Sequence, residues 1–166
     1  MFVIVCAIVL RLASLGFVLA FGSGESILSY GDGIVYTELA TSIANNQGFT
    51  IVNNAGERVL ETFRAPGLPF LLAFFMLIPH GVATWAFVLA IVAGILLPFL
   101  TYRIGEMLFD QRVGMIAAVL TAFEPHLVWF SWLALSEMPF ILFFLGGTWL
   151  LLSRLERGHW VWLLLS

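Results

Sequence analysis

The sequence predicts an all-α polytopic membrane protein, and three observations lead to that class. Apolar residues make up 61% of the chain and charged residues 10%, and the mean hydropathy is +1.05, far from the composition of soluble domains. The apolar residues fall in runs, several of which approach the roughly 20 residues that a helix needs to cross the hydrocarbon core. One long polar stretch, residues 22–69, interrupts these runs. We expect about four transmembrane helices, a re-entrant or interfacial helix, and a large first external loop.

The first apolar run covers residues 1–21 and predicts a transmembrane helix. It lacks the basic start and the small-residue cleavage site of a signal peptide. Its one charge is Arg11, which is costly inside a bilayer unless its guanidinium finds a partner. Two interpretations stay open, namely a buried pairing or cavity-lining role, and a tilted helix whose Arg11 snorkels to a headgroup.

The loop 22–69 predicts a surface helix followed by a small hairpin. After Asp32 the apolar residues Val35, Leu39 and Ile43 recur every four positions, as in an amphipathic helix, and Gly48 is expected to end it. From residue 49 to residue 63 two β-branched stretches flank the polar sequence NNAGE, which is typical of a hairpin. The loop carries five of the ten acids and two arginines.

The rest of the chain supplies the remaining helices. Residues 65–79 are apolar but short and contain two early prolines, so we expect a re-entrant or interfacial helix. Three further transmembrane helices are expected, at 82–102, 113–133 and 138–153, with residues 103–114 as a cytoplasmic turn. Glu124 and His126 flank Pro125 inside the second of them, where we expect a helix end. Residues 160–166 open another apolar segment, which suggests the N-terminal part of a longer single membrane domain, residues 1–166.

The arginines orient this topology. The four arginines after residue 79 occur in two pairs, Arg103 with Arg112 and Arg154 with Arg157, and cytoplasmic loops are enriched in positive charge. Both pairs face the cytoplasm only if residues 65–79 do not cross the membrane. The N-terminus is then cytoplasmic, and the loop 22–69 lies outside the cytoplasm with the short turn at Glu137.

This topology brings the scarce acids to one membrane face, and they are the candidates for catalysis. Carboxylates near a bilayer suit general-base chemistry or a divalent cation, and the two arginines of the loop suit a phosphate. Each residue also has a structural alternative: a helix cap for Asp32, a solvated helix face for Glu38, a loop charge for Glu57, and a surface ion pair for Glu61 with Arg64. The candidates are Asp32, Glu38, Glu57, Glu61, Glu137, Arg58 and Arg64.

The order of several short motifs resembles the opening of GT-C superfamily glycosyltransferases of the protein O-mannosyltransferase and aminoarabinose transferase type. These motifs are Asp32 after the first span, YTELA at 36–40, Gly48 with Phe49, RAPGLP at 64–69, and a stretch that ends in Glu137. The resemblance implies a plasma or inner membrane enzyme that moves a hexose or pentose from a polyprenyl-phosphate donor to an acceptor, with inversion, outside the cytoplasm.

The same resemblance implies roles for individual residues. Asp32 would orient or deprotonate the acceptor, and Glu137 and Glu61 would assist or hold a divalent cation where one is used. Arg64 and Arg58 would face the donor phosphate, and Tyr36 and Glu38 belong to the substrate-binding motif. Relatives are several times longer, so we expect the isolated 166 residues to be inactive. The implied partners are the bilayer and the donor lipid, without nucleic acid.

Two other functions stay open at this point. In a transporter the acids would be ion sites and residues 65–79 a broken helix near the membrane midplane. In a non-catalytic scaffold that binds lipid phosphate, substitution of Asp32 would leave function intact, whereas substitution of Arg64 would weaken lipid binding.

Overall fold

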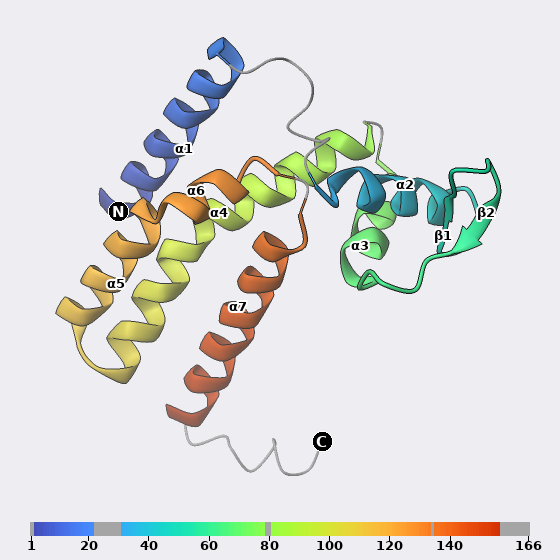
Figure 1. Cartoon of the computed structure of the whole chain (residues 1–166). Coiled ribbons are helices and arrows are strands. Elements are labelled where there is room, and N and C mark those ends of the chain that lie inside the picture. The colour runs from blue at the N-terminus through green and yellow to red at the C-terminus, as the bar shows by residue number, and fades with distance from the viewer. Residues whose placement is uncertain (1, 22–30, 79–80, 134, 157–166) are drawn as a thin grey trace.

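The computed structural model describes residues 2–21, 31–78, 81–133 and 135–156 and is mostly helical (Figure 1). The predicted all-α class is confirmed, with the small hairpin as the one sheet in the described part. In chain order the elements are α1 Phe2–Phe21, α2 Gly33–Ala44, β1 Thr50–Val52, β2 Arg58–Leu60, α3 Gly67–Phe75, α4 Val82–Leu108, α5 Gln111–Phe123, α6 Pro125–Phe130 and α7 Glu137–Glu156. The helix start expected at 160–166 lies outside the described residues.

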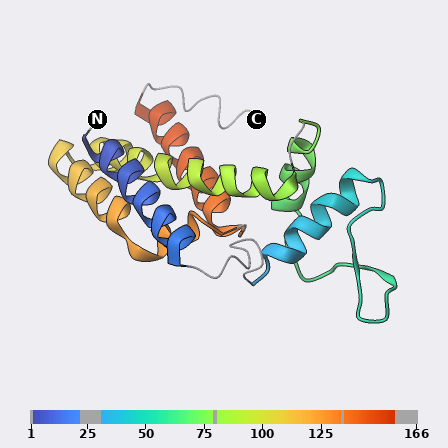
Figure 2. The same cartoon turned by 90° about the horizontal axis from the view of Figure 1, so that it is seen from above.

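Helix α4 is the centre of the molecule. Seen from above, α1 and α5 lie on one side along α4, and α2, α3 and the hairpin gather beyond its N-terminal end (Figure 2). Among the described residues two helices are long and apolar enough to cross a membrane, Thr84–Leu108 and Glu137–Leu155. They correspond to two of the four predicted spans. The span predicted at 1–21 remains a prediction, and the one predicted at 113–133 contains a shorter apolar helix, Gln111–Phe123.

The turn predicted at 103–114 is mostly helical, which corrects the sequence-based boundary. Helix α4 continues to Leu108 because Arg103 Nη1 donates to Glu106 Oε2 at 2.8 Å, an i, i+3 pair that supports the last turns. Asp110 then caps α5 by accepting from the Val113 amide at 2.8 Å. The two helices touch backbone to backbone, since a Cβ on Gly105 would lie 2.8 Å from Gly114 Cα.

The predicted span 113–133 is two helices that meet at Glu124. Pro125 cannot donate a backbone hydrogen bond, so the helix ends before it and α6 begins with Pro125 at its first position. Glu124 Oε2 accepts from the Leu127 amide at 2.7 Å and caps α6. The expected helix-end role of Glu124 is therefore confirmed. His126 Nδ1 lies 3.0 Å from Glu124 Oε1 in the same turn.

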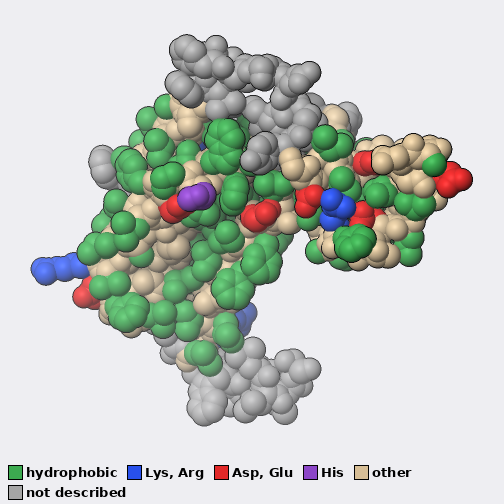
Figure 3. All heavy atoms as spheres, viewed as in Figure 1, with side chains coloured by type: hydrophobic (Ala, Val, Ile, Leu, Met, Phe, Trp, Pro, Cys, Tyr) green, Lys and Arg blue, Asp and Glu red, His purple; other side chains and the backbone are tan. Residues whose placement is uncertain are grey.

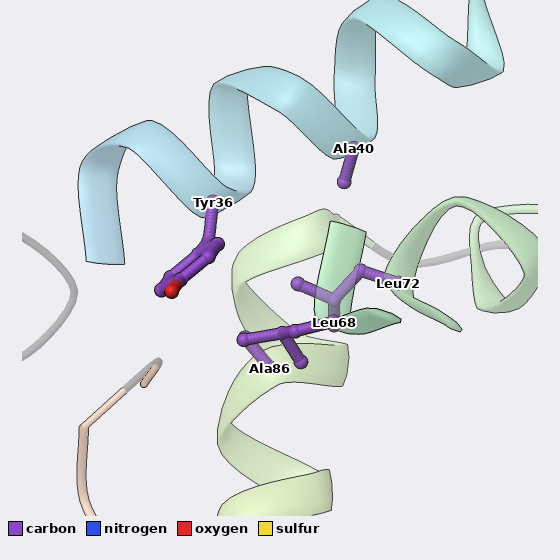
Figure 4. Close-up of a cluster of buried hydrophobic side chains, with 5 residues drawn as sticks. All are labelled: Tyr36, Ala40, Leu68, Leu72 and Ala86. Atoms are coloured by element: carbon purple, nitrogen blue, oxygen red, sulfur yellow. The ribbon is translucent and has the colours of Figure 1, made fainter. Parts of the chain in front are cut away.

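The outer part of the chain packs α2 on α3 and on the start of α4. Figure 4 shows the shared apolar core, which comprises Tyr36, Ala40, Leu68, Leu72 and Ala86. The helix predicted after Asp32 is present as α2, but its end is not at Gly48, and its place along the membrane surface remains a prediction. Asn46 adopts a left-handed φ of 58°, and the Gln47 amide bonds to the Ser42 carbonyl at 2.9 Å, which closes the helix earlier.

The hairpin and α3 complete this outer part. Strands β1 and β2 pair antiparallel with Ile51 opposite Val59, and Glu38 Oε1 accepts from the Val52 amide at 2.7 Å, which fastens the hairpin to α2. Helix α3 has nine residues, about 14 Å of helix. This length is too short to cross a bilayer.

Arg11 does not snorkel, which corrects one of the two interpretations of its charge. The residue is 1% exposed, and its Nε donates to Ser131 Oγ at 3.2 Å. It is buried among the helices, and the oxygen atoms that it bonds belong to neutral groups.

Candidate functional site

Arg64 joins two carboxylates that are far apart in the sequence. Its Nη2 lies 2.6 Å from Asp32 Oδ1 and its Nη1 lies 3.1 Å from Glu61 Oε2. Glu61 Oε1 accepts from the Phe63 amide at 2.7 Å. In the view of Figure 3, arginine and acidic side chains lie side by side over α2. We call Asp32, Glu61 and Arg64 the outer cluster.

The two carboxylates have different exposures and therefore different chemical availability. The Glu61 side chain is 2% exposed and both of its oxygens are engaged, whereas the Asp32 side chain is 53% exposed. The local ion pair expected for Glu61 with Arg64 is present, but its carboxylate is buried and not on the surface. The capping alternative for Asp32 is also wrong, because its side chain makes no cap bond to α2. Asp32 is the solvent-exposed carboxylate of the outer cluster.

The charges of the outer cluster stabilise one another. The Phe63 amide, followed by the Arg64 guanidinium, holds the pKa of Glu61 below its ordinary value of 4.5, although burial opposes this. The hydrogen bond to Asp32, supported by Glu61, raises the pKa of Arg64. Arg64 Nε is buried and has no hydrogen-bond partner in the described part of the chain. Both shifts favour the charged forms, so Glu61 and Arg64 are charged at neutral pH.

An apolar cavity of about 370 Å³ lies directly after Arg64. It separates the start of α3 from the start of α7, so the RAPGLP motif and the stretch around Glu137 meet there although about 70 residues separate them. The cavity is lined by Ala65, Gly67, Leu68, Leu71, Ser136, Pro139, Phe140 and Phe143.

Tyr36 connects this cavity to α2. Its hydroxyl lies 3.2 Å from Ser136 Oγ, so α2 and the start of α7 are tied beside the outer cluster. Glu137 is the next residue and is exposed at the first position of α7. Sequence reasoning missed Ser136, because a serine before a helix is common and its partner is 100 residues away.

Three predicted residues lie apart from the outer cluster. Glu57 is exposed in the hairpin turn, in agreement with its interpretation as a loop charge. Glu38 holds the Val52 amide, so it is more than a solvated charge. Arg58 Nη1 donates to Ser42 Oγ at 3.4 Å. Glu38 and Arg58 line a second cavity, of about 550 Å³, along α2 with Thr37, Thr41, Asn45 and Gln47.

No group of three or more His, Cys, Asp or Glu side chains that could hold a metal ion occurs among the described residues. The Arg64 guanidinium already bonds both carboxylates of the outer cluster, where a shared cation would have to bind.

A family model described as dolichyl-phosphate-mannose-protein mannosyltransferase matches residues 64–166, more than half of the chain. The match begins at Arg64 and includes Glu137, while Asp32 and Glu61 precede it. No curated protein and no solved structure matches the chain.

Proposed function

The chain belongs to the dolichyl-phosphate-mannose-protein mannosyltransferase family, and on that premise we propose that it transfers a sugar with inversion to an acceptor outside the cytoplasm. The family consists of membrane-integral glycosyltransferases of the GT-C type, which use a polyprenyl-phosphate sugar as donor. The side of the membrane, the stereochemistry and the residues that act are our proposal.

The distribution of arginines supports the extracytoplasmic side. Arg103 lies near the end of α4, Arg112 near the start of α5 and Arg154 near the end of α7. In Figure 1 the turn between α4 and α5 and the end of α7 lie together, away from α2, α3 and the hairpin. Because cytoplasmic ends are enriched in positive charge, we assign the outer cluster to the other side.

Asp32 is our candidate for the general base. It is the open carboxylate of the outer cluster, and Arg64 fixes its position. In the proposed step the acceptor hydroxyl attacks the anomeric carbon of the donor sugar, and its proton passes to Asp32. The bond from the anomeric carbon to the phosphate oxygen breaks, and the lipid phosphate leaves with the electron pair. One displacement from the opposite face inverts the configuration.

The observation that carries this proposal is the apolar cavity beside Arg64. A polyprenyl phosphate needs hydrogen-bond donors for its headgroup and an apolar surface for its chain. Arg64 precedes the cavity-lining residue Ala65 and has five N–H groups, of which the bonds to Asp32 and Glu61 use two, so we assign the headgroup to Arg64 and the chain to the cavity. Glu61 has no free oxygen for the substrate, so we assign it the role of holding Arg64. Glu137, which follows the cavity-lining residue Ser136, is the candidate that assists at the sugar.

The second cavity suits the acceptor. Seven of its ten lining residues have polar side chains, and it runs along α2 from Ile34 to Asn45, with Ile34 two residues after Asp32. We assign Glu38 and Arg58 to acceptor contacts in this cavity. Tyr36 stays on the donor side through its bond to Ser136.

The test is a transfer assay on the full-length chain in proteoliposomes, with a radiolabelled polyprenyl-phosphate mannose of known anomeric configuration and a serine-containing acceptor peptide. The expected product has the inverted configuration, and Asp32→Asn lowers turnover about 10²- to 10⁴-fold, the usual contribution of a general base. Glu57→Gln, an exposed acid of the same loop, is the matched control and keeps normal turnover.

The alternatives predict other results. Full transfer by Asp32→Asn would refute the role of Asp32. If the chain binds the donor lipid but no variant or parent transfers sugar, the scaffold function is correct. If acids of the cluster govern ion uptake into the vesicles instead, the transporter function is correct.

A further inference from the structure

Arg11 is the most buried charge of the described residues, and its partners lie on three helices. The residue is 1% exposed. Its Nε donates to Ser131 Oγ at 3.2 Å, and its Nη1 donates to the Ala7 carbonyl at 3.2 Å and to the Ala122 carbonyl at 3.5 Å. None of these acceptors is charged, so the residue serves a purpose other than ion pairing.

The Ala122 carbonyl is available because α5 is interrupted. In a continuous helix this oxygen would accept from the amide of residue 126. Glu124 has an extended conformation, with φ −64° and ψ 117°, and α6 starts afresh at Pro125. A helix end carries partial negative charge and free carbonyls. Arg11 therefore caps a helix end inside the apolar part of the protein, where water cannot do so.

Gly94 of α4 provides the space for this contact. A Cβ at Gly94 would overlap Ser131 Oγ and would lie 2.6 Å from Arg11 Nε. Ser131 is fully buried, accepts from Arg11 and donates to the Leu127 carbonyl at 2.7 Å. We call Arg11, Gly94, Ala122 and Ser131 the inner node.

A short connection leads from the inner node to the outer cluster. Ser131 ends α6, and the next residue, Trp132, is 2% exposed with its ring 5.8 Å from that of Phe87. Ser136, whose hydroxyl contacts Tyr36, and Glu137 follow within six residues of Ser131. Ser131 is thus five residues before Ser136, which lines the donor cavity.

We propose that Arg11 is a positioning residue: by capping α5 and holding Ser131, it fixes where Ser136 and Glu137 stand relative to α2. The catalytic consequence rests on the proposed transferase function, whereas the geometric consequence does not. Arginine suits the role because its planar fork presents Nε and Nη1 at once to oxygens on different helices, which the single ammonium of lysine does not reproduce.

The geometric test measures a distance between two spin labels in the full-length chain, in nanodiscs and with Cys6→Ser as background. The labels stand at Asn45→Cys, after α2, and Phe140→Cys, in the first turn of α7, both exposed. Arg11→Met is expected to shift or broaden this distance distribution. A second pair, Asn45→Cys with Leu77→Cys, reports the packing of α2 on α3 and should stay unchanged.

Ser131→Ala tests the same contact from its other partner, with a minimal loss of side-chain volume. It replaces Arg11→Met in the distance measurement if that variant does not fold. It removes the acceptor of Arg11 Nε and should also broaden the Asn45 to Phe140 distance. An unchanged distribution in both folded variants would overturn the proposal, whether or not the chain transfers sugar.

The catalytic test is a double-mutant cycle with Glu137→Gln. Misplacing a group by about 1 Å can cost about 10²-fold in rate, so we expect Arg11→Met to lower kcat by about 10- to 100-fold. If Arg11 acts through Glu137, the double variant loses no more than the more severe single variant. Fully multiplicative losses would contradict a link through Glu137. Absence of transfer by the parent chain would instead refute the proposed function. The distance measurement alone would then test whether Arg11 positions the start of α7 relative to α2.

Discussion

The outer cluster and the inner node each contain one arginine, and the two arginines have opposite surroundings. Arg64 bonds two carboxylates, and its side chain is 26% exposed. Arg11 bonds a hydroxyl and backbone carbonyls and is 1% exposed. Near water, a guanidinium can hold a reactive carboxylate in place. Inside the apolar region it can donate to the free carbonyl at a helix break and so fix the positions of the helices around it.

Removal of Arg64 should destabilise the fold more than removal of Arg58, the other arginine of the loop 22–69. Arg64→Met leaves Glu61 buried without its cation, and breaking a fully buried pair costs about 3–5 kcal/mol. Because Arg64 is partly exposed, we expect about 2 kcal/mol, measured by chemical unfolding in detergent. Arg58→Met is the matched control, since Arg58 has only a 3.4 Å bond to Ser42. Equal losses for both variants would contradict the pairing of Arg64 with Glu61.

Filling the space at Gly94 should disturb the inner node. Gly94→Ala places a methyl group against Ser131 Oγ and Arg11 Nε, and overpacking of this kind costs about 1–3 kcal/mol. The same unfolding assay measures it. Gly146→Ala in α7, where a Cβ meets nothing within 4 Å, should be neutral or slightly stabilising. If Gly94→Ala behaves like Gly146→Ala, the close contact is absent.

Low pH should weaken the outer cluster. Because the pKa of Glu61 is lower in the folded chain than its ordinary 4.5, Glu61 stabilises the fold above that pH and loses its contribution as the pH falls through the lowered folded value. The difference in unfolding midpoint between the parent and Glu61→Gln should therefore shrink from pH 7 to pH 3. If the difference in unfolding midpoint stays constant with pH, the charge of Glu61 does not contribute to the stability of the fold.

The hydrogen bond between Tyr36 and Ser136, which joins α2 to the start of α7, should make the smallest contribution to the free energy of unfolding. Tyr36→Phe removes the bond to Ser136, and a single hydrogen bond contributes about 0.5–1.5 kcal/mol. The apolar packing of the ring in the core of Figure 4 remains. Chemical unfolding of Tyr36→Phe, of Ser136→Ala and of the double variant measures the contribution of this bond. If the two single losses of unfolding free energy add in the double variant, the two hydroxyls do not interact.

Local features of this chain could be predicted from its sequence. The four-residue spacing of Val35, Leu39 and Ile43 gave the surface helix, and Pro125 gave the helix break with Glu124 at its end. The turn at 103–114 was misjudged, because a polar sequence with an internal Arg103 to Glu106 pair continues the helix. Each of these features depends on residues within a few positions of one another.

The sites depend on contacts between distant residues. Asp32 meets Arg64 across 32 positions, Tyr36 meets Ser136 across 100, and Arg11 meets Ser131 across 120. Spacing in the sequence carries no information about such pairs. Motif resemblance indicated Asp32, Arg64 and Glu137, but neither the burial of Glu61 nor the uncharged partners of Arg11 followed from it.

The central claim is that Asp32 acts in the chemical step while Arg64 and the cavity hold the donor. The most direct measurement compares donor binding with single-turnover transfer in Asp32→Asn, in the reconstituted full-length chain. We predict donor affinity close to that of the parent and transfer reduced at least about 10²-fold. Transfer at the parent rate, or a loss of binding that accounts for the whole loss of transfer, would contradict the claim.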